Sequence, residues 1–173
     1  MCCTLQHGGP DDAGFYEATD CQLVLGHRRL SVIDVSAGGH QPLLYDNERY
    51  AISYNGELYN YKELKKELAD AGSYFKTQSD TEVIVAAYAA WGIAALERFN
   101  GMFAFAIWDN YSKELLIARD PSGIKPVYYS FTKEGFAFAS EVRAFKDIPY
   151  LQEGNNNWPV YFMAYGHLPE PVT

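Results

Sequence analysis

The sequence has no apolar run long enough to cross a membrane, no block of basic residues and only three cysteines. Its longest apolar stretch, residues 83–90, ends at Trp91-Gly92, well short of the roughly 18 residues that a spanning helix needs. The formal net charge is −8, which argues against a nucleic-acid-binding surface. No basic segment followed by an apolar core marks a signal peptide. We therefore expect a cytoplasmic protein that binds neither nucleic acid nor membrane.

The cysteines, Cys2, Cys3 and Cys21, are odd in number and follow no spacing typical of a metal site. Without a signal peptide, this pattern favours free thiols in a reducing compartment. We expect no metal in this chain, and we expect Cys3 to act as a small apolar residue.

The composition is that of one folded domain. Of the 173 residues, 48% are apolar and 16% aromatic, which suffices for a substantial core. Apolar runs separated by turn residues predict strands over residues 22–33, 49–55, 101–109, 114–119, 127–131 and 135–140. Helical spacing follows two candidate N-caps, Asn60 and Ser79, and each helix is expected to end at a glycine, near Gly72 and Gly92. Helices packed on antiparallel sheet, an α+β fold, follow from this pattern.

The amino-acid composition of the chain changes after Lys146. Residues 154–157 read GNNN and residues 167–171 read HLPEP, which is typical of loops and linkers. We therefore divide the chain into a domain over residues 1–148 and a linker over residues 149–173 that leads towards a further domain.

Cys2 follows an initiator methionine of the kind that is removed before a small residue. Removal would give Cys2 a thiol and a free α-amine, with ordinary pKa values of about 8.5 and about 7.7–8.0. Such a residue can act as a nucleophile with its own amine as the proton carrier. The alternative is a cysteine that follows Met1 by chance.

Acyl transfer from an amino-acid substrate needs further groups, and the sequence offers candidates. Asn55-Gly56 could supply an amide and a backbone N–H to an oxyanion, although Asn-Gly is also the strongest short signal for a hairpin turn. Arg29 could bind an α-carboxylate, and Glu57 and Asp80 could bind an α-ammonium. Each has a structural alternative: a solvent-facing arginine, a loop glutamate and a helix N-cap.

Six ordered stretches together carry a family resemblance. They are GHRRLSVID (26–34), YNGELYN (54–60), SDTEV (79–83), NGMFAFAIWD (100–109), ARDPSGIKPVYY (118–129) and FASE (138–141). They resemble the N-terminal glutaminase domain of glutamine-hydrolysing asparagine synthetases, a class II glutamine amidotransferase domain. The resemblance implies the N-terminal-nucleophile hydrolase fold, a four-layer αββα sandwich.

The resemblance also implies roles for individual residues. Cys2 would be the nucleophile, and Asn55 and Gly56 would form the oxyanion hole. The pocket for glutamine would consist of Arg29 on the α-carboxylate, Glu57 and Asp80 on the α-ammonium, and backbone groups around Val32 and Ile33.

The implied substrate is L-glutamine, and the glutaminase step needs no cofactor. Ammonia would pass to an ATP- and Mg-dependent synthetase domain of the full-length protein, absent here, for asparagine synthesis. A homodimer is left open. Two other readings also stay open: a domain that delivers ammonia to another acceptor, and a catalytically silent domain that shares the fold and only binds a partner or ligand.

The start of the chain departs from the family pattern. Family members carry a strand and a helix between the nucleophile and a His-Arg-Gly-Pro-Asp motif, whereas here only residues 3–6 separate Cys2 from His7. At about 3.3–3.6 Å per residue, four residues cannot form a strand, a helix and a return, so roughly twenty or more family residues are missing. Three explanations of the gap stay open: residues absent from the printed sequence, an internal deletion, or a natural loss. Gly8 also stands where the family usually has arginine.

Overall fold

The structure is a computed structural model that describes residues 1–30, 37–148, 160 and 163–164. Its strands are β1 Asp12–Ala18, β2 Leu23–Arg29, β3 Leu43–Tyr45, β4 Tyr50–Leu58, β5 Gly101–Asp109, β6 Glu114–Arg119, β7 Tyr128–Phe131 and β8 Phe136–Ala139. Its α-helices are α1 Tyr61–Asp70 and α2 Asp80–Trp91, and its 3-10 helices are η1 Cys3–Leu5, η2 Ala37–Gly39, η3 Gly92–Arg98 and η4 Val142–Asp147. None of the described helices has the length and apolar character of a membrane-spanning segment.

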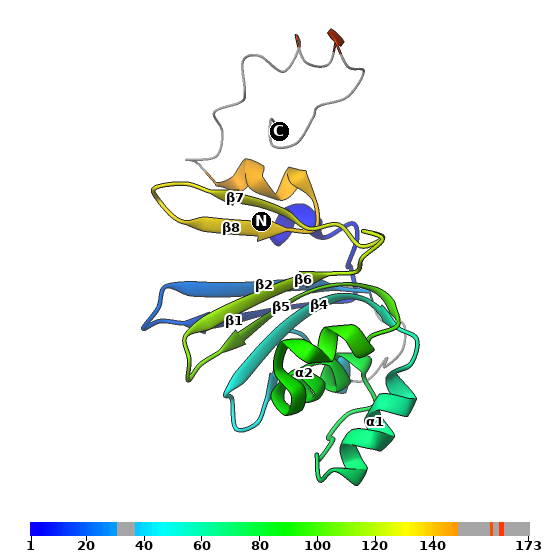
Figure 1. Ribbon diagram of the computed structural model, residues 1–173. Helices are drawn as coiled ribbons and strands as arrows, with labels where there is room; N and C mark the ends of the chain where they lie inside the picture. The colour runs from blue at the N-terminus through cyan, green and yellow to red at the C-terminus, as the bar shows by residue number, and fades with distance from the viewer. Residues whose placement is uncertain (31–36, 149–159, 161–162, 165–173) are drawn as a thin grey trace.

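The strands form a layered α+β sandwich, as predicted. Strands β3, β4, β5 and β6 make one antiparallel sheet in that order, and β1–β2 and β7–β8 are separate antiparallel hairpins. In Figure 1, helices α1 and α2 lie on one side of the four-stranded sheet and the two hairpins lie on the other. In Figure 1 the 3-10 helix η4 lies on the outer side of the β7–β8 hairpin, and η1 lies at the level of that hairpin.

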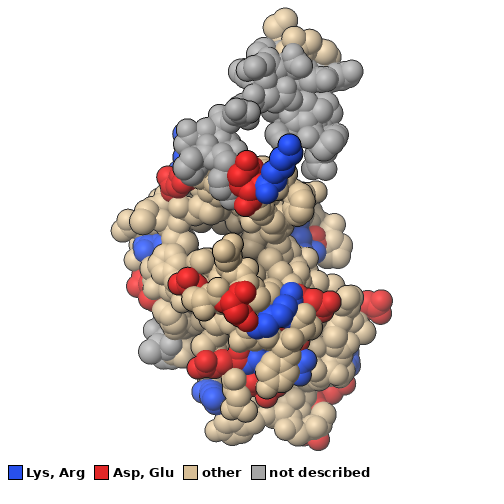
Figure 2. Space-filling model, turned by 90° about the vertical axis from the view of Figure 1, so that its left-hand side faces the viewer, with Lys and Arg blue, Asp and Glu red and all other residues tan. Residues whose placement is uncertain are grey.

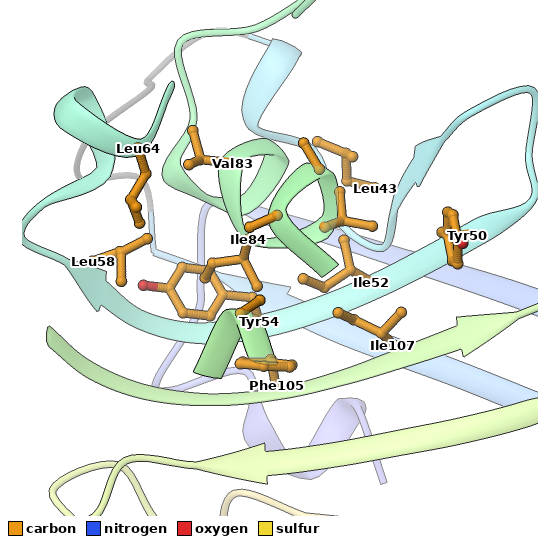
Figure 3. Packing of buried hydrophobic residues seen from close by; sticks show 14 of the residues in the cluster. Leu43, Tyr50, Ile52, Tyr54, Leu58, Leu64, Val83, Ile84, Phe105 and Ile107 are labelled. Carbon is orange, nitrogen blue, oxygen red and sulfur yellow. The ribbon is translucent and has the colours of Figure 1, made fainter. Parts of the chain in front are cut away.

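The main core lies between the four-stranded sheet and helix α2. Strand periodicity turns alternate residues of β4 towards the helices, and Ile52, Tyr54 and Leu58 are buried there. Figure 3 shows these side chains meeting Val83 and Ile84 of α2. Burial of one such aliphatic side chain contributes about 1.5–3 kcal/mol, so this layer holds α2 against the sheet.

A smaller core lies on the opposite face of the same sheet. Ala51, Ala106 and Trp108 pack there against Ala18 and Leu25 of the β1–β2 hairpin. The four-stranded sheet is therefore covered on both faces, which agrees with the near-continuous apolar runs of its central strands.

The predicted helices are confirmed, but only one of the two predicted N-caps is. Ser79 Oγ accepts a hydrogen bond from Thr81 N–H at 3.1 Å, and α2 ends at Gly92, whose φ is +59°. Asn60 precedes α1 but makes no capping bond. Its amide instead donates to Arg98 O at 2.9 Å and accepts from Asn100 N–H at 3.0 Å, because it joins α1 to the turn before β5.

The predicted strands 101–109 and 114–119 are confirmed residue for residue as β5 and β6. The strand predicted to end at residue 55 is longer, because β4 runs on to Leu58 and pairs with β5 throughout. The Asn55-Gly56 pair is therefore part of a strand, and the hairpin-turn alternative is wrong. Strand β2 ends at Arg29, short of the predicted residue 33; residues 31–33 lie outside the described part of the chain. Strands β1 and β3 are not predicted from the sequence.

The start of the chain contains no strand before β1, as its length requires. Residues Cys3–Leu5 form the 3-10 helix η1. The Met1 amine donates to Asp147 Oδ2 at 2.7 Å, and the Thr4 hydroxyl donates to the same oxygen, so η1 is tied to η4. The proposed linker, 149–173, lies outside the described residues except for 160 and 163–164.

Candidate functional site

One large cavity collects most of the predicted site residues. Its volume is about 940 Å³, and its walls come from the β1–β2 hairpin, the four-stranded sheet, the β7–β8 hairpin and the N-terminus. Figure 2 shows this side of the molecule hollowed between its two halves. Six of the eight predicted residues line the cavity: Cys2, Arg29, Asn55, Gly56, Glu57 and Asp80. The other two, Val32 and Ile33, lie outside the described residues.

Strand β4 presents two kinds of group to this cavity. The side chains of Asn55 and Glu57 lie on the face opposite the α2 core, because successive residues of a strand alternate between faces. Of the backbone N–H groups, that of Tyr54 donates to Gln41 Oε1 at 2.6 Å and that of Leu58 to Asp80 Oδ2 at 3.0 Å.

The N–H of Gly56 points to the same edge of β4, between those two hydrogen bonds, because N–H groups two residues apart point the same way. Among the described residues it has no side-chain acceptor, unlike its neighbours at 54 and 58. An oxyanion could therefore receive this N–H together with the Asn55 amide, which lines the same cavity.

Gly56 has a structural reason to be glycine as well. A Cβ at this position would overlap the Met102 carbonyl oxygen and lie 2.8 Å from the Phe103 Cα. The backbones of β4 and β5 approach each other closely here, so any larger residue would push the two strands apart.

Asp80 begins helix α2, lines the cavity and is only 5% exposed. Its Oδ2 accepts from the Tyr54 hydroxyl at 2.9 Å as well as from Leu58 N–H. Burial raises the pKa of this carboxyl above its ordinary value, against the opposing effect of those two hydrogen bonds. A cationic ligand group would offset the burial and stabilise the ionised carboxylate.

Arg29 is the last residue of β2 and is 9% exposed. It shares a face of the strand with Leu25 and His27, and Leu25 packs against the four-stranded sheet. The Arg29 side chain therefore belongs to the inner layer of the fold, where Asn55 and Glu57 also lie.

Cys2 reaches the cavity from the other side of β2. Its sulfur lies against Gly26, so close that a Cβ at residue 26 would be 2.5 Å from it. Residues 26 and 29 point to opposite faces of a strand, so the sulfur lies on the outer face and Arg29 on the inner one. Burial raises the pKa of the Cys2 thiol, against the effect of the nearby N-terminal ammonium.

Four further polar residues that line the cavity were not identified from the sequence. Gln41 bridges β4 and α2 by accepting from Tyr54 N–H and donating to Thr81 Oγ1 at 3.4 Å. Tyr54 supports Asp80, as described above. His27 lies 3.2 Å from Ser53, measured from Nδ1 to Oγ. Each bond joins residues that are far apart in the chain, so no local sequence pattern predicts it.

In the part of the chain that is described, charged and metal-ligating side chains form no second candidate site. No group of three or more His, Cys, Asp or Glu side chains there could hold a metal ion. On the face in Figure 2, basic side chains lie beside acidic ones and form no continuous basic patch.

Comparison with known proteins gives consistent matches. The family model for a glutamine amidotransferase domain matches residues 1–171. The chain is 43% identical over 167 residues to asparagine synthetase [glutamine-hydrolyzing] 1 of Bacillus subtilis. This alignment covers 96% of the chain but only 26% of that protein. It is 36% identical over 188 residues to a putative asparagine synthetase of Methanocaldococcus jannaschii, covering 98% of the chain and 36% of that protein.

A solved structure is also similar. Glutamine phosphoribosylpyrophosphate amidotransferase from B. subtilis, complexed with ADP and GMP, superimposes with a TM-score of 0.62 at 30% identity. The match covers 72% of this chain and 29% of that one. The chain thus spans only about a quarter to a third of the length of these relatives.

Proposed function

Because this chain belongs to the glutamine amidotransferase domain family, we propose that it hydrolyses L-glutamine to glutamate and ammonia through a thioester on Cys2. The observation that carries the proposal is the edge of β4. There the Gly56 N–H lies between two N–H groups that already have acceptors, next to Asn55, while Cys2 lines the same cavity from the outer face of β2.

The proposed first step is attack of the Cys2 sulfur on the side-chain amide carbon of glutamine. The α-amine of Cys2, free once Met1 is removed, takes the thiol proton and returns it to the leaving nitrogen. Negative charge that develops on the amide oxygen is stabilised by Asn55 and the Gly56 N–H. The C–N bond breaks, ammonia leaves, and water then attacks the thioester and releases glutamate and the thiol.

The amino-acid end of glutamine would be bound by charge. The Arg29 guanidinium pairs with the α-carboxylate, for which its planar donors are suited. The carboxylates of Glu57 and Asp80 pair with the α-ammonium. Backbone groups near Val32 and Ile33 complete the proposed pocket.

We further propose that the ammonia serves a synthetase domain in the full-length protein, as the names of the relatives suggest. ATP and Mg would act in that domain, and none of the residues above is assigned to them. The three cysteines are free thiols, which supports a cytoplasmic location. Light scattering of the full-length protein would decide whether it forms a homodimer.

A glutamine-like diazoketone tests the proposed nucleophile. We expect the Met1-free chain to gain one adduct, mapped to Cys2, and a Cys2→Ala chain to gain none. Excess L-glutamine should slow the labelling of Cys2. Labelling at Cys3 or Cys21 instead, or none at all after Met1 removal, would reject the mechanism.

A second candidate function is a catalytically silent domain that binds a ligand or partner. One observation favours it: the Cys2 sulfur lies on the outer face of β2, whereas Asn55 lies on the inner side. Retained Met1 would leave no free amine on Cys2. The intact mass of the purified chain distinguishes the two candidates, because loss of Met1 is required only by the first.

A further inference from the structure

A hydrogen bond joins the inner face of the β1–β2 hairpin to the four-stranded sheet. His27 Nδ1 lies 3.2 Å from Ser53 Oγ, with His27 on β2 and Ser53 on β4. The two strands belong to different sheets, so no backbone ladder sets their relative position. Both residues line the large cavity.

The position of this bond relates it to the proposed glutamine pocket. Arg29 follows His27 by two residues on β2, and Asn55 follows Ser53 by two residues on β4. Residues two apart share a face of a strand and lie about 7 Å apart along it. The bond therefore lies one side-chain repeat from each of the two groups that would contact opposite ends of glutamine.

The charge state of His27 suits a permanent structural hydrogen bond. Burial, reinforced by the positive charge of Arg29, lowers the pKa of His27 to about 4, with Asp12 acting in the opposite direction and His40 in the same one. The imidazole is therefore neutral near pH 7 and adds no charge beside Arg29. A serine hydroxyl can donate or accept, so the bond can form with either tautomer of the ring.

We propose that His27 is a positioning residue. Its hydrogen bond with Ser53 ties β2 to β4 and sets the separation of Arg29 from Asn55, so that one glutamine molecule reaches both. The proposal deepens the proposed function and rests on it for the identity of the ligand.

Binding of L-glutamine to a Cys2→Ala chain tests the ligand side of this proposal without turnover. We expect Ser53→Ala and His27→Leu each to raise the calorimetric Kd about 3- to 10-fold, as expected for the loss of one hydrogen bond. The double variant should be no weaker than the worse single one, because both changes remove the same bond. His27→Asn, which keeps a polar atom near the Nδ1 position, should restore most of the affinity.

A matched control is His40→Leu. His40 also makes a side-chain hydrogen bond, to Asp12 Oδ2 at 2.7 Å, but it does not line the large cavity. We expect its Kd to stay within about twofold of the reference chain. Thermal unfolding of every variant is measured alongside, because a merely structural role would lower Tm and leave Kd unchanged, and that result would overturn the proposal.

The ligand-free chain gives an independent readout by nuclear magnetic resonance. Ser53→Ala should shift the Arg29 side-chain Nε–H resonance on the other sheet as well as the Asn55 amide on its own strand. Shifts confined to β4 would overturn the proposal. A reference chain that binds no glutamine would overturn the proposed function, and this resonance measurement would then still decide whether the pair couples Arg29 to Asn55.

Discussion

The sulfur of Cys2 lies against Gly26, and a Cβ at residue 26 would stand 2.5 Å from it. Alanine at position 26 must therefore move the sulfur or bend β2. We expect Gly26→Ala to lower the kcat of glutamate release by roughly 10- to 100-fold, because small displacements of a reacting group have effects of that size.

Gly8→Ala is the matched control for this prediction. A Cβ at residue 8 would meet its nearest atom, Glu141 Oε1, at 3.7 Å, an ordinary contact. We expect a rate close to that of the unchanged chain. Equal rates for Gly26→Ala and Gly8→Ala would mean that the contact between Cys2 and Gly26 is absent from the working enzyme.

Removal of the Asn55 amide tests the oxyanion hole. We expect Asn55→Ala to reduce kcat by about 10²–10³-fold, the usual effect of losing one oxyanion donor. The Kd for L-glutamine in the Cys2→Ala background should change much less, since the charge is fully developed only in the transition state. Unchanged turnover would reject this role for Asn55.

Retention of Met1 should separate binding from catalysis. In a chain produced with methionine aminopeptidase inhibited, the Met1 amine keeps its pairing with Asp147 and Cys2 has no free amine. We expect measurable glutamine binding but no glutamate release, with the intact mass confirming the extra residue. Turnover by the Met1-bearing chain would exclude the α-amine as the proton carrier.

The buried imidazole of His27 predicts a dependence of stability on pH. Its pKa is about 4 when folded and about 6.5 when unfolded, so between these values the unfolded chain binds a proton that the folded chain does not. The free energy of unfolding therefore falls as pH drops through this window, and the contribution of His27 is complete above pH 6.5.

Urea unfolding at pH 7 and pH 5 measures this effect. His27→Gln should lose about 2 kcal/mol less stability over that interval than the unchanged chain. The carboxyl groups of the protein titrate in both chains, so the difference isolates His27. The same loss in both chains would show that His27 is not held neutral.

The parts of the fold that could be predicted are those with a strong local pattern. Strands β5 and β6 are apolar runs bounded by polar loop residues, and α2 has Ser79 before it and Gly92 after it. Strand β1, which contains Asp12, Ala13 and Gly14, has little intrinsic strand preference. Its conformation comes from pairing with β2, which a local reading cannot detect.

The residues of the candidate site also fall into those that a local sequence pattern predicts and those that it does not. Asn55, Gly56 and Asp80 could be proposed because motifs carry them, and they line one cavity. The supporting bonds made by Gln41, Tyr54 and His27 join segments 13 to 40 residues apart. They depend on how the sheets and α2 pack, so only the folded structure reveals them. At Asn60 the local pattern predicts a helix cap that does not form, because its side chain makes tertiary hydrogen bonds instead.

Release of glutamate and ammonia from L-glutamine, measured on the chain after mass spectrometry has shown that Met1 is gone, tests the proposed hydrolysis most directly. We expect equal amounts of the two products, at a rate that Cys2→Ala abolishes. Absence of turnover in the Met1-free chain, or turnover that survives Cys2→Ala, would contradict it.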